Sequence, residues 1–346
     1  MKLNFVPYLI KFKRPFSIAH GVRDSTPVVF TRLESQGVIG YGEASMPPYL
    51  GESHQSAILF LDKAKNLLQK FSNPLEVEPI LTEVDKLAKG NTAAKACIDI
   101  ALHDLVGKIK NESCYKLFGA NNNKKLYTTY TIPIDNPEGI HNRLEEAKEY
   151  EILKVKLGSA NDKGIIDEIR KQTNKRIVVD VNEGWSDKIE ALEMIHWLAD
   201  RNVQFVEQPM PKECRVDIGW LTKHSPIPII ADEAVQRLTD IEKVAGIYSG
   251  INIKLMKCTG LNEARKMISL ARKYEMKIMI GCMSETSCAI SAAAQLAPLV
   301  DWIDLDGPLL IAEDYFNGVT FAQGQVMLNN LPGIGVTPLP NLPNFD

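Results

Sequence analysis

The sequence lacks several features that define whole classes of proteins. No apolar run approaches the roughly 18 residues of a membrane-spanning helix, and the first residues show no apolar stretch with a small-residue cleavage site. Six cysteines in 346 residues, none in a Cys-x-x-Cys pair, do not make a disulfide scaffold. We therefore expect reduced thiols and a cytoplasmic location.

An excess of charge of one sign is also missing. The 40 Lys and Arg residues nearly balance the 43 Asp and Glu residues, leaving a net charge of −3. This balance argues against nucleic acid or an anionic membrane surface as the main partner. With 45% hydrophobic residues the chain can bury a large core. We expect a globular enzyme with a small-molecule partner, and the sequence leaves open whether it forms a homo-oligomer.

The first 120 residues have the pattern of an α+β unit. Residues 3–12 are extended in pattern, and residues 28–33 and 38–42 form two short runs joined by a glycine-containing turn, which predicts a hairpin. A helix is predicted to begin after Asn91 as its N-cap. Its apolar face would carry Ala94, Cys97, Ile98, Ala101, Leu102, Leu105 and Ile109.

From about residue 124, short runs rich in β-branched residues alternate with helical patterns. Seven runs cover residues 152–157, 177–181, 203–207, 227–231, 251–255, 277–280 and 302–305. Strands that alternate with helices predict parallel βα units. Their steady period favours a closed (β/α) barrel over an open sheet.

A charged residue recurs at or near the end of almost every predicted barrel strand. The six positions are Lys154, Asp180, Glu207, Asp232, Lys254 and Asp304. A charged group is costly on a barrel strand unless it lies at the C-terminal mouth, where barrel active sites lie. A simpler interpretation is that strands end in polar residues where they meet solvent, but six aligned positions argue against it.

Three of these positions are acids on consecutive strands. Because consecutive barrel strands are neighbours, the carboxylates of Asp180, Glu207 and Asp232 should converge. They would repel one another unless a cation separates them. Oxygen ligands without His or Cys favour Mg²⁺, with Mn²⁺ as a substitute. Open positions for water and a substrate oxygen would make this a catalytic metal site.

Three lysines surround this predicted metal site. Lys154 and Lys156 lie on the same face of one strand, and Lys254 lies across the barrel from them. A solvated lysine is a poor base at neutral pH, so we expect a metal ion, neighbouring ammonium groups and desolvation to lower its pKa. This layout suits removal of a proton α to a carboxylate and its return on the opposite face.

Taken together, the motifs resemble one known group. They are Lys154-Val155-Lys156, Asp180-Val181-Asn182, Val206-Glu207-Gln208-Pro209, Ala231-Asp232-Glu233, and residues 40–48, 252–257 and 331–335. In this order they resemble the muconate-lactonizing subgroup of the enolase superfamily over nearly the whole chain. Within the subgroup, the pair Asp304 and Asp306 makes the dipeptide epimerases the nearest match.

The resemblance implies an architecture. It implies a (β/α)7β-type TIM barrel over residues 121–325 and an N-terminal α+β capping domain over residues 1–120. The C-terminal tail, residues 326–346, would return to the capping domain and complete it. Residues 16–28 and 46–54 match the two capping loops that close over the substrate side chain.

The resemblance also implies an activity and roles. The activity is Mg²⁺-dependent inversion of the C-terminal residue of an L-Ala-X dipeptide, with L-Ala-D/L-Glu as the leading substrate. The three strand-end carboxylates would bind Mg²⁺, which chelates the substrate's C-terminal carboxylate. Lys156 and Lys254 would be the two acid/base groups. Lys154 would stabilise the enediolate.

Further residues would contact the dipeptide. Asp304 and Asp306 would hold its free α-ammonium group, although a simple turn is an alternative interpretation of this pair. Thr131, Asn182 and Cys282 fall where family members contact the substrate. For each of these three, a purely structural role is an equally good interpretation.

The first capping loop departs from the pattern of Glu-specific members, which can carry an arginine that meets the substrate's γ-carboxylate. Gly21 falls at that position, with Arg23 two residues later. Either Arg23 takes over the role or the enzyme prefers another side chain. Three alternatives to a dipeptide epimerase stay open: o-succinylbenzoate synthesis or cycloisomerisation, a Schiff-base aldolase, and a non-catalytic binding protein.

Overall fold

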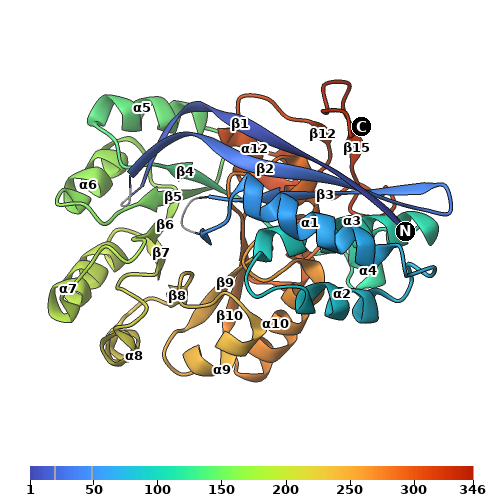
Figure 1. The fold of residues 1–346 in the computed structure, drawn as a ribbon. Coiled ribbons are helices and arrows are strands. Elements are labelled where there is room, and N and C mark those ends of the chain that lie inside the picture. The colour runs from blue at the N-terminus through green and yellow to red at the C-terminus, as the bar shows by residue number, and fades with distance from the viewer. Residues whose placement is uncertain (19–20, 48–49, 346) are drawn as a thin grey trace.

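A computed structural model describes residues 1–18, 21–47 and 50–345. An antiparallel sheet with helices packs against a barrel, and the strands at the blue end of the chain reach over the green barrel strands (Figure 1). The α+β cap and the parallel barrel predicted from the sequence are both confirmed. None of the helices in the described ranges is long and apolar enough to cross a membrane.

The N-terminal sheet has the order β1-β2-β3. Its strands are β1 (Lys2–Ile18), β2 (Gly21–Ser35) and β3 (Val38–Ser45). The predicted hairpin joins β2 and β3, and both Gln36 and Gly37 take positive φ at its turn, as tight hairpin turns require. The first two strands are longer than predicted because their outer halves pair with each other beyond the apolar runs.

Four helices follow this sheet, α1 (His54–Leu68), α2 (Val77–Lys86), α3 (Thr92–Ile109) and α4 (Cys114–Leu117). Helix α3 begins after Asn91 as predicted, but the Asn91 side chain forms no capping hydrogen bond. The carboxylate of Glu52 instead accepts hydrogen bonds from the amides of Ala93 and Ala94. A residue distant in sequence therefore caps this helix, which a local pattern cannot reveal.

The barrel is an eight-stranded parallel sheet in strict chain order. Its strands are β4 (Thr129–Ile132), β5 (Ile152–Lys156), β6 (Arg176–Asp180), β7 (Val203–Glu207), β8 (Ile229–Ala231), β9 (Gly250–Lys254), β10 (Lys277–Gly281) and β11 (Trp302–Asp304). A bridge between Thr128 and Ile303 brings the first and last strands together. The seven predicted strands are all present, and β4, only four residues long, was not recognised as the eighth.

Seven helical connections link these strands and confirm the (β/α)7β type. They are α5 (Pro137–Glu146), α6 (Asp162–Gln172), α7 (Lys188–Ala199), α8 (Arg215–His224), η2 (Leu238–Asp240) with α9 (Ile241–Val244), α10 (Leu261–Lys273), and α11 (Ser287–Ala294) with η3 (Ala297–Leu299). The short helix α12 (Gly307–Leu310) follows the last barrel strand. Beyond it, β12 (Phe316–Asn317) pairs with β15 (Thr337–Pro338), and β13 (Thr320–Ala322) pairs with β14 (Gln325–Met327).

The register of the barrel brings the charged strand ends to one rim. Lys156 pairs with Asp180, and Asp180 pairs with Glu207. On the other side of the barrel, Gly281 pairs with both Lys254 and Asp304. Because all strands are parallel, these residues lie at the same C-terminal edge.

The C-terminal tail returns to the N-terminal helices as predicted. The amide of Cys114 donates to the carbonyl oxygen of Gly333 at 2.8 Å, and the amide of Ile334 donates to Asp104 Oδ1 at 3.0 Å. Gly333 has a φ of +73°, and a Cβ there would lie 2.1 Å from Asp104 Oδ1, so only glycine fits. The boundaries at residues 120 and 325 stay predictions.

A buried glutamate joins the N-terminal sheet to the barrel. Glu43 on β3 accepts hydrogen bonds from the amide of Thr286 at 2.9 Å, from the Thr286 hydroxyl, and from the amide of Ala289 at 3.2 Å. These donors belong to the start of α11, where a carboxylate is favoured. Burial nevertheless raises the pKa of Glu43 to about 7.

This shift predicts a pH-dependent contribution to stability. The raised pKa favours the folded state fully below the ordinary value of 4.5, and the contribution is lost as pH rises through about 7. Between about pH 5 and pH 8, the unchanged protein should lose on the order of 3 kcal/mol of unfolding free energy relative to Glu43→Gln. Denaturant unfolding across this range measures the difference.

The exposed Glu83 on α2 provides the control. Glu83→Gln removes one carboxylate from an exposed position, so it controls for the loss of a carboxylate as such. If the pH profiles of Glu43→Gln and the unchanged protein run parallel, Glu43 does not cause the pH dependence of the unfolding free energy.

Candidate active site

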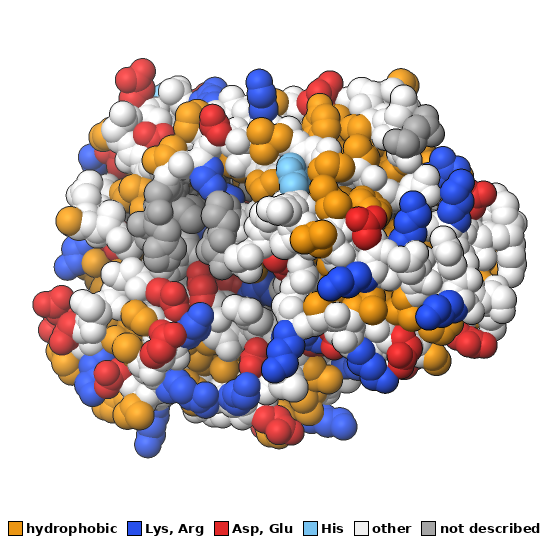
Figure 2. All heavy atoms as spheres, viewed as in Figure 1, with side chains coloured by type: hydrophobic (Ala, Val, Ile, Leu, Met, Phe, Trp, Pro, Cys, Tyr) orange, Lys and Arg blue, Asp and Glu red, His pale blue; other side chains and the backbone are white. Residues whose placement is uncertain are grey.

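A cavity of about 210 Å³ lies at the C-terminal rim of the barrel. Its lining includes Arg23, Thr131, Lys154, Lys156, Asn182, Asp232, Lys254, Cys282, Asp304 and Asp306. Figure 2 shows Asp and Glu side chains gathered near the middle of this face. The sequence-predicted site residues are therefore brought together. Asp180 and Glu207 are buried, and each has a carboxylate oxygen within 4.8 Å of one on Asp232, which lines the cavity.

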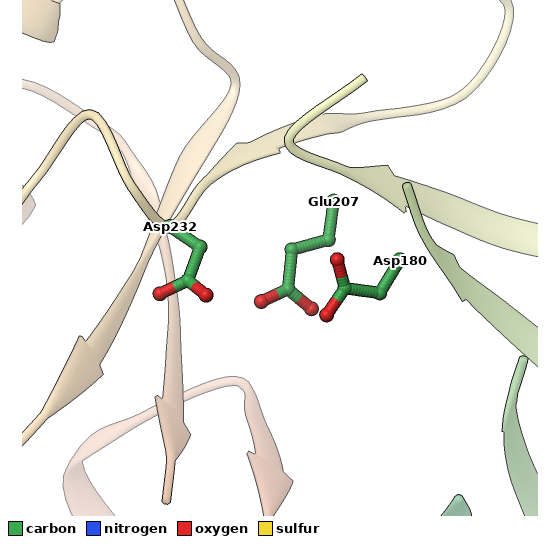
Figure 3. Close-up of side chains that lie close together, drawn as sticks. All are labelled: Asp180, Glu207 and Asp232. Atoms are coloured by element: carbon green, nitrogen blue, oxygen red, sulfur yellow. The ribbon is translucent and has the colours of Figure 1, made fainter. Parts of the chain in front are cut away.

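The three predicted metal ligands converge at this site. One carboxylate oxygen from each of Asp180, Glu207 and Asp232 lies within 4.8 Å of the others. Asp180 and Glu207 are the last residues of β6 and β7, and Asp232 directly follows β8. Their side chains approach one another from three adjacent strands (Figure 3).

Three buried lysines contact these carboxylates. Lys154 Nζ lies 3.0 Å from Asp180 and 2.7 Å from Glu207. Lys156 Nζ lies 2.7 Å from Asp180, and Lys254 Nζ lies 2.7 Å from Asp232. Lys156 thus contacts the carboxylate of β6, and Lys254 contacts the carboxylate that follows β8.

The electrostatics of the cluster are uneven. Burial opposes the ionisation of Asp180, but the ammonium groups of Lys154 and Lys156 outweigh it and lower its pKa to about 2. Burial and the charge of Asp180 raise the pKa of Glu207 to about 7. Burial therefore outweighs the nearby lysines at Glu207 but not at Asp180.

The expected fall in lysine pKa includes the effect of a bound metal ion, and the carboxylates around Lys154 act in the opposite direction. Burial lowers its pKa, but the carboxylates of Asp180, Asp304 and Glu207 outweigh burial and hold the pKa well above its ordinary value. A lysine held charged in this way suits stabilisation of negative charge rather than proton abstraction.

The donor set fits a hard divalent cation. Three carboxylate oxygens within 4.8 Å of one another are ligands that Mg²⁺ accepts. Glu207 Oε2 is buried and accepts no hydrogen bond from the residues described, although Lys154 Nζ is close. The raised pKa of Glu207 also fits a cation site, because a cation would offset the repulsion from Asp180 that causes part of the shift.

The two acids predicted to bind the substrate's ammonium group, Asp304 and Asp306, also lie at the cavity. Asp304 accepts hydrogen bonds from Lys154 Nζ at 2.7 Å and from the hydroxyl of Thr129. Asp306 Oδ2 accepts from the amide of Thr131 at 2.8 Å. Burial and the charge of Asp304 raise the pKa of Asp306 to about 6. Both carboxylates line the cavity, which the simple-turn interpretation does not explain.

The remaining predicted contacts also border the cavity. Asn182 takes a left-handed backbone conformation, with φ of 45°. Its side chain accepts from Lys156 Nζ at 3.1 Å and donates to Glu233 Oε1 at 3.1 Å. Cys282 follows β10 directly, and burial raises the pKa of its thiol well above the ordinary value. The cysteine is therefore part of the wall rather than a nucleophile.

Arg23 reaches the cavity from strand β2. Its guanidinium carbon lies 5.8 Å from the centroid of the Phe12 ring. Of the two predicted capping loops, residues 19–20 and 48–49 lie outside the described residues. The arginine that the sequence placed near the substrate side chain is therefore at the cavity.

The sequence predicted no role for three further residues of the site. Glu233 lines the cavity, and burial together with the charges of Asp232 and Asp180 raises its pKa to about 8. Asn252 donates to Glu207, and Lys257 donates to Asp232. A second lysine three positions after Lys254 was a signal for Lys257, because a buried lysine needs acidic partners.

Two family descriptions match the chain. Residues 3–119 match the mandelate racemase/muconate lactonizing enzyme N-terminal domain. Residues 139–342 match the enolase C-terminal domain-like family.

Relatives cover almost the whole chain. The L-Ala-D/L-Glu epimerase of Bacteroides thetaiotaomicron is 52% identical, and the alignment covers 97% of this chain and 88% of the relative. The L-Ala-D/L-amino acid epimerase of Pedosphaera parvula is 37% identical, over 96% of this chain and 97% of the relative.

A solved structure is also similar. The dipeptide epimerase of Cytophaga hutchinsonii, complexed with Mg and the dipeptide D-Ala-L-Val, superposes with a TM-score of 0.92. It is 27% identical, and the match covers 98% of this chain and 96% of that chain. Two family matches that together span most of the chain and a relative at 52% identity agree with the barrel and its rim of acids and lysines. This chain belongs to the mandelate racemase/muconate lactonizing enzyme family of the enolase superfamily.

Proposed function

We propose that this protein is a Mg²⁺-dependent dipeptide epimerase that inverts the α-carbon of the C-terminal residue of an L-Ala-X dipeptide. The observation that carries this proposal is that Lys156 ends β5 and Lys254 ends β9, which lie on opposite sides of the eight-stranded barrel. Both ammonium groups face one cavity. Two bases on opposite sides of a bound carbon are what a 1,1-proton transfer requires.

The proton transfer uses the two lysines in turn. In one direction, neutral Lys156 removes the α-proton from one face and protonated Lys254 delivers a proton to the other face. In the reverse direction their roles exchange. Mg²⁺ held by Asp180, Glu207 and Asp232 would bind the substrate carboxylate and offset the negative charge that grows as the proton leaves, with Mn²⁺ as a substitute.

Lys154 has a different role in this proposal. The surrounding carboxylates hold it protonated, so it supplies a fixed positive charge where the enediolate oxygen develops. Fixed charges of this kind are most effective when they need no rearrangement during the reaction.

The substrate's N-terminus is assigned to the acids beside the three-carboxylate cluster. Asp304 and Asp306 both face the cavity, and Thr131 holds Asp306 through its backbone amide. A free α-ammonium group between two carboxylates selects dipeptides over N-blocked amino acids. The alternative activities, o-succinylbenzoate synthesis and cycloisomerisation, have no use for this pair.

The side chain of the inverted residue would lie toward Arg23. The guanidinium favours an acidic side chain, so L-Ala-D/L-Glu is the leading substrate, as in the 52% identical relative. Asn182 and Cys282 would complete the wall around this residue. We place the reaction in the cytoplasm, in keeping with six cysteines that remain free thiols.

The two-base assignment makes a prediction for deuterium exchange. Lys254→Ala and Lys156→Ala should each stop net epimerisation, because a proton can no longer be taken from one face and delivered to the other. Each variant should still exchange the α-proton of one epimer with D₂O without inverting it. Separate measurement of deuterium incorporation into each epimer by NMR would reveal this opposite selectivity.

Two further variants complete the exchange experiment. Lys154→Met should impair both directions alike, because Lys154 serves the intermediate rather than one face. Lys95→Ala, which removes a buried lysine of the capping helices, should leave the selectivity unchanged. Interconversion of the epimers at a rate near that of the unchanged protein in either base variant would show that the assignment is wrong.

The ammonium-binding pair makes a second prediction. N-acetylation of the dipeptide should lower kcat/KM, because it removes a charge that pairs with buried acids. The loss should correspond to about 2–5 kcal/mol of transition-state stabilisation. Asp306→Asn should cause a similar loss with the free dipeptide. Steady-state kinetics with both substrates and both proteins form a double-mutant cycle.

In that cycle, Asp306→Asn should have little further effect on the acetylated substrate. Equal turnover of free and acetylated dipeptides by the unchanged protein would instead favour the alternative activities. Losses that simply add would mean that Asp306 acts elsewhere than on the ammonium group.

A further inference from the structure

Each of the three clustered carboxylates has two differently occupied oxygens. Asp180 Oδ2, Glu207 Oε2 and Asp232 Oδ2 contact the lysines Lys154, Lys156 and Lys254. The other oxygens accept hydrogen bonds from groups outside this lysine set: Asp180 Oδ1 from the amide of Asn182, Glu207 Oε1 from Asn252 Nδ2, and Asp232 Oδ1 from Lys257 Nζ. The inner and outer oxygens are thus held by separate groups.

We propose that Asn252 and Lys257 are positioning residues that orient Glu207 and Asp232 for the cation. Each would hold the outer oxygen of one carboxylate, so that the inner oxygen faces the shared centre. This inference rests on the proposed function, because it takes the three carboxylates as the Mg²⁺ ligands. Loss of a group that holds a metal ligand in place typically lowers metal affinity by about 10–100-fold.

The surroundings of Asn252 are shaped for this contact. Asn252 is fully buried in β9, and Nδ2 lies 2.7 Å from Glu207 Oε1. Asn252 Oδ1 accepts no hydrogen bond from the residues described, which is costly in a barrel interior. Gly281 on the neighbouring strand makes room for the amide, since a Cβ there would lie 2.5 Å from Asn252 Oδ1. An apolar residue would fit this position without an unsatisfied oxygen, so the contact with Glu207 explains the asparagine.

Lys257 forms hydrogen bonds with both the side chain and the backbone of Asp232. Its Nζ donates to Asp232 Oδ1 at 2.5 Å and to the carbonyl oxygen of Asp232 at 2.6 Å. A third donation, at 3.3 Å, reaches the carbonyl oxygen of Asn252. Because the ammonium group holds both the side chain and the backbone of Asp232, it restricts the rotation of the carboxylate. Lys254 contacts the opposite oxygen, Oδ2.

Two physical effects of Lys257 on cation binding have opposite signs. Its positive charge beside Asp232 repels a cation, so by Coulomb's law alone its removal should tighten Mg²⁺ binding. Its contacts preorganise Asp232, so by orientation alone its removal should weaken binding. We expect the preorganisation of Asp232 to outweigh the Coulomb repulsion between Lys257 and the cation. The sign of the change in Mg²⁺ affinity therefore decides between the two effects.

The test is isothermal titration calorimetry of Mg²⁺ with the full chain in the absence of substrate. Lys257→Met and Asn252→Leu should each raise the Mg²⁺ Kd by about 10–100-fold. Lys257→Gln, which keeps a neutral donor, should show a smaller increase than Lys257→Met. Circular dichroism and thermal unfolding without metal show whether each variant is folded.

Control variants separate the possible causes. Lys95→Met removes a buried lysine that pairs with Asp85 in the capping helices, and it should leave the Kd unchanged. Gly281→Ala should weaken Mg²⁺ binding as Asn252→Leu does, because the added Cβ displaces the amide. This variant keeps the proposal testable where Lys257→Met fails to fold.

The outcomes distinguish this inference from the proposed function. A Kd that is unchanged or lower in the folded Lys257 and Asn252 variants would overturn the positioning role and leave the epimerase proposal in place. Failure of the unchanged protein to bind Mg²⁺ would instead overturn the metal site itself. Weaker binding in both variants, with Lys257→Gln in between, supports the proposal.

Discussion

Mutual neutralisation of buried carboxylates and buried ammonium groups at the barrel mouth is the constraint on which the rest of the structure depends. Asp180 and Glu207 are fully buried, and isolated charges there would be prohibitively costly. Their pairing with Lys154 and Lys156 lowers this cost but does not remove it, as the raised pKa of Glu207 shows. The converging oxygens of Asp180, Glu207 and Asp232 remain suited to a divalent cation, so the same buried charges govern both the stability and the chemistry of the site.

The capping unit and the barrel are joined next to this cluster. Glu43 of the N-terminal sheet binds the start of α11 through Thr286, and the neighbouring Ser45 hydroxyl donates to the carbonyl oxygen of Ser284 at 2.8 Å. Ser284 also lines the active-site cavity. The segment after β10 is thus held from the capping side, while the barrel strands hold the acids and lysines. The substrate cavity lies where the two sets of contacts meet.

The sequence predicted most of the barrel and its charged rim, because strand-end residues such as Asp180 and Lys254 follow a regular spacing. It missed contacts that have no local pattern. Strand β4 consists of Thr129–Ile132, so it forms no apolar run and has no charged residue at its end. The cap of α3 comes from Glu52, about forty residues earlier in the chain. Asn252 and Lys257 were visible in a motif, but their roles depend on which oxygen of Glu207 or Asp232 each one contacts. Only the side-chain arrangement supplies that information.

The central claim is that the site removes and returns the α-proton of a dipeptide's C-terminal residue. Its most direct test is incubation of a mixed library of L,L-dipeptides with the protein and Mg²⁺ in D₂O, read by mass spectrometry. The account predicts incorporation of a single deuterium, confined to the C-terminal residue and strongest in L-Ala dipeptides, with L-Ala-L-Glu foremost. Absence of deuterium from every dipeptide, with the protein folded and Mg²⁺ present, would contradict it.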